Sequence, residues 1–168
     1  TEQLQHIRRV LQEREPQVVS EWVAEVLAAS GSATEAAQRT LHAEAQEIAR
    51  ALRAALEAGA DPSRLDGPGW APLRQVLDAL SRSRAAQGQS AADTSLFVLA
   101  LKKPFFAALQ GAPGDNKQAL LDTLWALSTL VDRLAQWTVS SYQQTREEII
   151  KRQQQDLLEL STPVIKLW

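Results

Sequence analysis

The chain has no cysteine and only two histidines, His6 and His42, among its 168 residues. Without cysteine it cannot form a disulfide, a thiolate site for zinc or an iron–sulfur cluster, or a cysteine nucleophile. Two histidines are also too few for a three-histidine metal site. A glycine-rich phosphate loop, an H-E-x-x-H motif and a G-x-S-x-G motif are missing as well. We therefore expect a protein that is not an enzyme and that holds no metal and no cofactor.

Long apolar runs and an excess of positive charge are absent too. No apolar run approaches the roughly 18–20 residues of a membrane-spanning helix, and segment 1–16 lacks the apolar core of a signal peptide. Lys and Arg number 18 and Asp and Glu number 20, which gives a net charge of −2. A general nucleic-acid binder is normally basic. The sequence therefore predicts a cytoplasmic domain that binds neither nucleic acid nor membrane.

The residues that are abundant favour helices. Alanine, leucine and glutamine dominate, and the alternating β-branched residues of strands are nearly missing. Apolar residues recur at helical spacing, and proline and glycine divide the chain into six predicted helices. These helices cover about 2–15, 16–30, 35–58, 70–86, 91–110 and 116–160. Pro104 lies inside the fifth and predicts a kink or a break near Lys102. The expected fold is all-α.

The last predicted helix is too long for a compact domain. Its 45 residues, from Asn116 to Leu160, make about 67 Å, whereas a domain of this size is only roughly 40 Å across. Before Tyr142 it has a rich apolar stripe, which Leu121, Trp125, Leu130 and Trp137 widen. After Tyr142 it is mainly polar. We therefore expect a helical domain over 1–142 and a projecting linker helix over 143–161.

A thin apolar seam continues through this polar linker. Ile150, Leu157 and Leu160 fit the a and d positions of a coiled coil, with Gln153 as a polar interruption. Two weak heptads cannot hold a dimer alone, so we expect the linker to pair with its copy after the globular part has dimerised. The residues expected to take part in this pairing are Tyr142, Ile149, Ile150, Leu157 and Leu160.

The final residues change character again. Ser161, Thr162 and Pro163 are expected to end the helix, and residues 164–168 alternate like the start of a strand. A single strand has no partner in an all-helical chain. Residues 162–168 are therefore predicted to begin a sheet-containing domain that is cut short.

Several side chains are candidates for binding. Phe97, Phe105 and Trp125 could line an apolar pocket between helices, and ordinary core packing is the alternative. The basic residues that flank the turn at Gly88 either bind an anionic ligand or an acidic partner, or form a solvated rim. These are Arg82, Arg84, Lys102 and Lys103. The two histidines either pack or ligate haem, but neither falls in 70–110, where a globin would place its proximal histidine.

Two stretches resemble the RsbR family of stressosome proteins. Residues 145–168 (TREEIIKRQQQDLLELSTPVIKLW) are similar to the family's helical linker, in which Leu-Ser-Thr-Pro-Val leads into a STAS domain. Residues 84–106 (RAAQGQSAADTSLFVLALKKPFF) are similar to the R-x-x-Q-G…F-V…L-K-x-P-L-F pattern of its N-terminal domain. The resemblance implies an all-helical, globin-like domain without haem, which dimerises and is joined by its last helix to a STAS domain.

The same resemblance implies a regulatory function. In the family, STAS domains assemble with an RsbS-like scaffold protein and hold an RsbT-type switch kinase until stress releases it, while the N-terminal domains act as sensors. The family's phosphorylated threonines belong to the STAS domain, so none is assigned to this chain and Thr162 is not one of them. The alternative is a haem or small-ligand receptor of the same fold with a different output, such as a histidine kinase.

Overall fold

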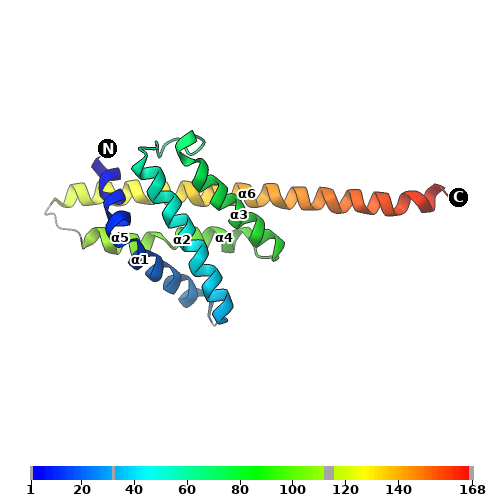
Figure 1. Cartoon of the computed structure of the whole chain (residues 1–168), viewed down its shortest axis with the longest axis horizontal. Coiled ribbons are helices and arrows are strands. Elements are labelled where there is room, and N and C mark those ends of the chain that lie inside the picture. Colours follow the sequence, from blue (N-terminus) through cyan, green and yellow to red (C-terminus); the bar gives the residue numbers. More distant parts are fainter. Residues whose placement is uncertain (1, 32, 112–115, 167–168) are drawn as a thin grey trace.

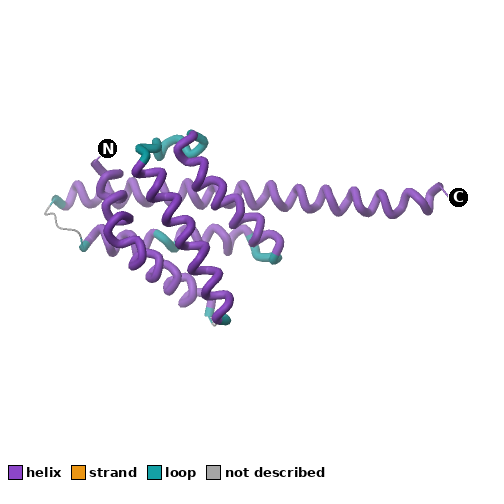
Figure 2. Tube along the Cα trace, viewed as in Figure 1, coloured by secondary structure: helices purple, strands orange, loops and turns teal. Residues whose placement is uncertain are grey.

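The computed structural model describes residues 2–31, 33–111 and 116–166, and these residues form an all-α structure without a strand. Figure 1 and Figure 2 show a globular group of helices from which one long helix extends. The helices are α1 (Glu2–Ser30), α2 (Glu35–Glu57), a short 3-10 helix η1 (Pro68–Trp70), α3 (Ala71–Ala86), α4 (Ala91–Leu99), α5 (Lys102–Gln110) and α6 (Lys117–Lys166).

Proline explains where the helices differ from simple periodicity. The first two predicted helices are the two segments of α1, which meet at a kink where Arg14 is non-helical (φ −133°, ψ 21°) just before Pro16. The predicted change of helix at Pro16 is therefore confirmed to within two residues, because the proline ring interrupts the helix in the turn before it and two helical segments meet at this kink. The expected break near Lys102 is confirmed, since α4 ends at Leu99 and α5 begins at Lys102. Pro104 lies in the first turn of α5, where its missing N–H has no intrahelical acceptor.

The core lies between the helices: α3 and α4 pack most extensively against the first half of α6, and α2 packs against α1 and α3. Its largest fully buried side chains include Trp22, Trp70, Phe105, Ile48, Leu52 and Leu127. Trp22 joins α1 to α4, because its indole N–H donates to the Phe97 carbonyl (2.8 Å) and its ring stacks on the Phe97 ring with the centroids 5.0 Å apart. Each fully buried large side chain contributes about 1.5–3 kcal/mol, so this cluster holds the globular part together.

One part of the predicted core is wrong. Leu121 and Trp125 were expected to widen the buried stripe of α6, but they are 58% and 76% exposed. The buried stripe runs through Leu127, Leu130, Val131 and Leu134. Two apolar columns lie side by side at the start of α6, and a helix that packs on one side can bury only one of them.

The second half of α6 extends beyond the globule as expected (Figure 1). Tyr142 is the last buried residue of α6 as far as Thr162, where the described burial ends, and the helix continues from Tyr142 to Lys166, which is about 36 Å of further helix. The expected helix end at Ser161 is wrong. The Ser161 and Thr162 hydroxyls donate to the Leu157 and Leu158 carbonyls at 2.7 Å each.

The strand expected over residues 164–168 is not present in the described part, because residues 164–166 are helical. A strand needs a neighbour to satisfy its backbone groups, whereas a helix satisfies its own. Leu167 and Trp168 lie outside the described residues. The assignment of 162–168 to a further domain stays a prediction.

Candidate functional site

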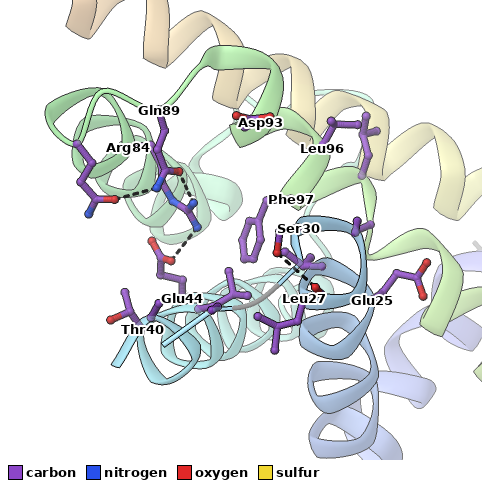
Figure 3. A pocket seen from close by; sticks show the side chains of 18 of the residues that line it. Glu25, Leu27, Ser30, Thr40, Glu44, Arg84, Gln89, Asp93, Leu96 and Phe97 are labelled. Carbon is purple, nitrogen blue, oxygen red and sulfur yellow. Dashed lines mark hydrogen bonds and ion pairs between the residues drawn. The ribbon is translucent and has the colours of Figure 1, made fainter. Parts of the chain in front are cut away.

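A groove of about 940 Å³ lies between the second half of α1, the first half of α2, the end of α3, and α4. Figure 3 shows this space, which we call the α2–α4 groove, with side chains converging on it from these helices. Its apolar lining includes Leu27, Ala33, Ala37, Leu41, Leu96 and Phe97. Sites for small molecules are usually about 300–1,000 Å³ and mainly apolar, so the groove has the size and lining of a binding site.

Local sequence explains why the groove stays open. Gly31 follows α1 with φ +83°, a left-handed conformation that glycine adopts without strain, and it turns the chain into α2. The lining at the start of this segment includes Ala33 and Ala37, whose methyl groups fill little space. Leu96 lines the same groove and remains 60% exposed. The groove is therefore a place where small residues leave a larger apolar side chain uncovered.

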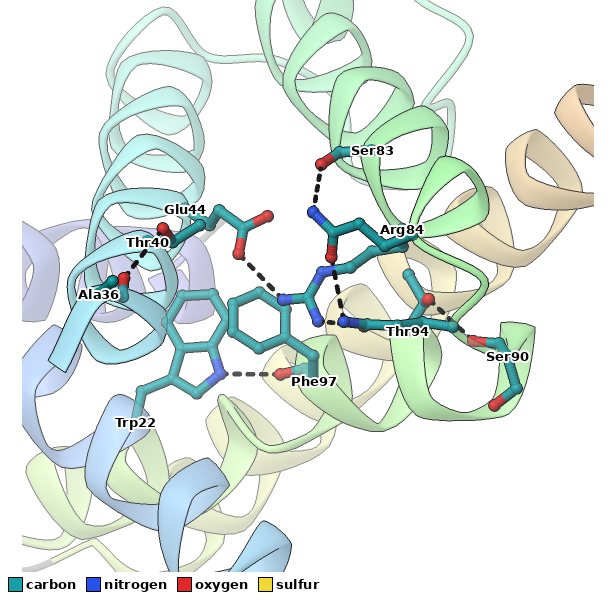
Figure 4. A network of polar contacts seen from close by, with 11 residues as sticks. Trp22, Ala36, Thr40, Glu44, Ser83, Arg84, Ser90, Thr94 and Phe97 are labelled. Atoms are coloured by element: carbon teal, nitrogen blue, oxygen red, sulfur yellow. Dashed lines mark hydrogen bonds and ion pairs between the residues drawn. The ribbon is translucent and has the colours of Figure 1, made fainter. Parts of the chain in front are cut away.

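A polar corner closes one end of the groove. The Arg84 guanidinium donates to the Glu44 carboxylate (2.9 Å) and to the Gln89 side-chain oxygen (2.5 Å). It also lies over the Phe97 ring, 5.3 Å from the centroid. Figure 4 shows Arg84 between Glu44 and Phe97. We call Glu44, Arg84 and Gln89, which are all labelled in Figure 3, the Arg84 cluster. Its members come from α2, from α3 and from the turn after α3, so it fixes three segments relative to one another.

The charges of the Arg84 cluster are largely removed from water. The Arg84 and Glu44 side chains are only 13% and 20% exposed. Burial raises the pKa of the Glu44 carboxyl above its ordinary value, and this effect exceeds the opposite effect of the neighbouring Arg84 charge. The carboxylate therefore takes up a proton at a higher pH than an ordinary glutamate does.

The turn that carries Gln89 is attached to α6 where α6 leaves the globule. The Tyr142 hydroxyl donates to the Gln89 backbone carbonyl, and the Ser81 hydroxyl of α3 donates to the Thr138 carbonyl at 3.0 Å. Gly88 makes the turn with φ +77°, where a residue with a side chain would be strained. The Arg84 cluster therefore contacts the groove on one side and, through Gln89, the base of the projecting helix on the other.

Each of the other basic residues expected at this turn lies apart from the Arg84 cluster. Lys103 pairs with Glu25 (3.3 Å), and Lys102 pairs with Asp132 (2.6 Å). Arg82 is exposed. The four basic side chains thus do not converge on one anion-binding point.

The three aromatic residues predicted to line a pocket have three different environments. Phe97 lines the groove. Phe105 is fully buried in the core, and it is not among the lining residues of the groove. Trp125 lies on the outside of α6 with 76% of its surface exposed, so it lines no enclosed space within this chain.

Neither histidine faces the α2–α4 groove. His6 lies half-buried beside a small cleft of about 200 Å³, which Glu2 and Asp122 also line. His42 is exposed on α2. Among the described residues no cluster of three or more His, Asp or Glu is placed to hold a metal ion. None of the described helices combines the length and apolar character of a membrane span.

The sequence singles out Arg84 and Phe97 but not Glu44 or Gln89. Glu44 lies 40 residues from its arginine partner, and no local pattern distinguishes it from other glutamates on a polar helix face. For Gln89 a signal existed, because Gly88 marks a tight turn that brings residue 89 back towards residue 84.

The outside of α6 is the second candidate surface. In the described part of the chain, six of the seven large hydrophobic residues that are exposed lie on this helix. Leu121, Trp125, Ile150 and Leu157 project within about 40° of one another around the helix axis, because Leu157 follows Leu121 by ten full turns. We call these four residues the outer face of α6. They lie on both the globular and the projecting parts of the helix.

The residues predicted to pair the linkers divide into two groups. Ile150, Leu157 and Leu160 are 44%, 67% and 73% exposed, and Ile149 is half-buried. Tyr142 is only 7% exposed and bonds to Gln89 of its own chain. Its main contact is therefore with its own domain, and its predicted place in the pairing seam stays a prediction.

A model of the family described as "RsbT co-antagonist protein rsbRD N-terminal domain" matches residues 16–157. This match includes the second half of α1, all of α2 to α5, and α6 as far as Leu157. The chain matches no curated protein and no solved structure. The globin-like arrangement that the sequence resemblance implies therefore stays a prediction.

Proposed function

Because the chain belongs to the family of RsbT co-antagonist rsbRD N-terminal domains, we propose that it is the sensory and regulatory module of a stressosome protein. It is not an enzyme and it works in the cytoplasm. It dimerises and passes a stress signal through α6 to a STAS domain that follows in the same chain. That STAS domain, together with an RsbS-like scaffold, controls an RsbT-type switch kinase.

The observation that best supports this proposal is the projecting half of α6. An isolated helix in water has no tertiary packing to stabilise it, yet α6 continues for about 36 Å beyond Tyr142. Its polar sides are suited to solvent, since Glu147 and Glu148 precede Lys151 and Arg152 by four residues in the favourable order. The apolar outer face remains without a partner. A second copy of the same helix would cover it.

We infer a parallel pair of α6 helices. In a parallel pair each outer-face residue lies opposite its own copy, and both C-terminal ends reach the same side, where two STAS domains can respond together. Leu121 and Trp125 then extend the contact onto the globular part. Each large side chain that is fully buried in this way adds about 1.5–3 kcal/mol to the association. This is why the dimer does not depend on the short linker seam alone.

The absence of native cysteine allows a direct test of this geometry. In a parallel pair, residue 157 of one helix faces residue 157 of the other. The two sulfurs of Leu157→Cys can then form a disulfide, which needs Cα atoms about 4.4–6.8 Å apart. Mild oxidation should then give a covalent dimer. Gln155→Cys is the matched control, because residue 155 lies on the opposite side of the helix, about 160° around the axis. Equal cross-linking of the two variants, or none in Leu157→Cys, would contradict the parallel pair.

A further inference from the structure

The α2–α4 groove has a composition that selects its occupant. We propose that it binds an uncharged, mainly apolar small molecule and that this molecule is the input of the sensor. Ligand binding can be tested independently of the proposed function, whereas the role of the ligand as the input of the sensor rests on that function.

The lining favours an apolar ligand because it leaves apolar surface in water. Leu96 is 60% exposed at the groove, and Leu27, Ala33 and Ala37 line the same space. An apolar molecule that covers such surface gains about 25 cal/mol for each Å² removed from water. The volume of about 940 Å³ admits a molecule with two or three rings.

The charges of the groove favour a neutral ligand because they already have partners. Arg84 pairs with Glu44 and Lys103 pairs with Glu25, while Lys102 pairs with Asp132. Asp93 lies in the first turn of α4, where the helix dipole stabilises a negative charge. A charged ligand would have to replace one of these partners, whereas a neutral one leaves them in place.

The ends of the groove favour a small molecule over a helix of another protein. Figure 3 shows the Arg84–Glu44 pair at one end and Glu25 towards the other. The ion pairs Arg84–Glu44 (2.9 Å) and Lys103–Glu25 (3.3 Å) connect different helices across these ends. A continuous helix, about 10–12 Å wide with its side chains, would have to separate them. A compact molecule fits between them.

The groove is attached to α6, so ligand binding in the groove affects the position of this helix. A ligand in the groove contacts Phe97, over which the Arg84 guanidinium lies. Arg84 holds the Gln89 side chain, and the Gln89 carbonyl accepts the Tyr142 hydroxyl. A shift of Arg84 therefore reaches the base of α6 through two hydrogen bonds. A ligand that binds one position of this turn better than another changes the position of α6.

The test uses N-phenyl-1-naphthylamine, a neutral probe whose fluorescence rises in apolar surroundings, and this chain as it is. We expect saturable binding with one site per chain. Ala37→Trp fills the groove and should raise the Kd at least tenfold. Ala43→Trp places the same residue on an exposed position of α2 outside the groove and should leave the Kd unchanged. Equal affinity in both variants would overturn the site.

Two further measurements separate the parts of the proposal. The anionic probe 8-anilino-1-naphthalenesulfonate should bind at least tenfold more weakly, and tighter binding than the neutral probe would refute the preference for an uncharged ligand. The neutral probe should also change the rate of cross-linking in Leu157→Cys by at least twofold. An unchanged rate with a saturated groove would refute the role as an input. Cross-linking without any probe binding would refute the site and leave the proposed function standing.

Discussion

The hydrogen bond from Tyr142 to Gln89 can be removed with little other change. Tyr142→Phe keeps the aromatic ring in its buried position, where the tyrosine is 7% exposed, and deletes only the hydroxyl that donates to the Gln89 carbonyl. The carbonyl is then left without this donor. Because this hydrogen bond is only partly buried, its loss costs about 1–2 kcal/mol.

We expect Tyr142→Phe to lower the free energy of unfolding by about 1–2 kcal/mol. In a chain of this length such a loss lowers Tm by roughly 2–8 °C. The assay is urea unfolding followed by tryptophan fluorescence, because Trp22 and Trp70 are buried in the globular core and report on it rather than on the linker. The dependence of the free energy on urea concentration should not change, since the ring still packs.

Ser140→Ala is the matched control for Tyr142→Phe. Ser140→Ala removes a hydroxyl from an exposed position of the same helix and should change stability by less than about 0.5 kcal/mol. If Tyr142→Phe is as stable as this control, the hydroxyl makes no buried bond and α6 is not attached at Gln89. The connection between the groove and the projecting helix would then lose its last step.

Two more outcomes follow from the charges and from the outer face. Burial raises the pKa of the Glu44 carboxyl in the folded state. Its contribution to stability is therefore complete below the ordinary glutamate pKa of about 4.3 and is lost as the pH rises through the higher folded value. In urea titrations the stability of the wild type relative to Glu44→Gln should fall as the pH is raised from 4 to 7, and a rise would refute the raised pKa. The double variant Ile150→Lys with Leu157→Lys should raise the Kd of the dimer at least a hundredfold in sedimentation velocity and leave the Tm of the globular part unchanged, because two apolar contacts per chain are lost outside it. The control, Gln144→Lys with Gln155→Lys, adds the same charge on the opposite side of α6 and should leave the dimer intact. Equal weakening by both pairs would contradict a seam at Ile150 and Leu157.

Helix positions and the projection of α6 could be predicted because they depend on short-range rules. Apolar spacing, caps and glycine stops act within a few residues, and Ser90 indeed caps α4 by accepting from the Asp93 N–H at 3.0 Å. The length of α6 follows from the absence of helix breakers, and its projection follows from comparing that length with the size of a compact domain. The kink at Arg14, two residues before Pro16, follows from the same kind of rule, since proline interrupts the helical hydrogen bonds of the preceding turn.

The arrangement of the site could not be predicted, because it depends on contacts between distant segments. Glu44 and Gln89 join Arg84 across 40 and 5 residues, and Tyr142 reaches Gln89 across 53. The prediction that Leu121 and Trp125 lie on the buried side of α6 was wrong for a related reason. At Trp125 the pattern allows two neighbouring apolar columns, and the packing of α3 and α4 on α6 decides between them.

The two sides of α6 give a physical account of how a weak contact can control a long helix. One side is held to the globule at Tyr142, and the outer face is open to a second copy. A tilt of about 5° at Tyr142 would move the end of the projecting part, about 36 Å away, by roughly 3 Å, which is comparable to the helix shifts that operate other switches. The bond that opposes this tilt is worth about 1 kcal/mol net. A coupling free energy of about 1–3 kcal/mol is typical of allosteric ligands, so a ligand with a differential affinity of this ordinary size would be enough to shift the helix without disturbing the core.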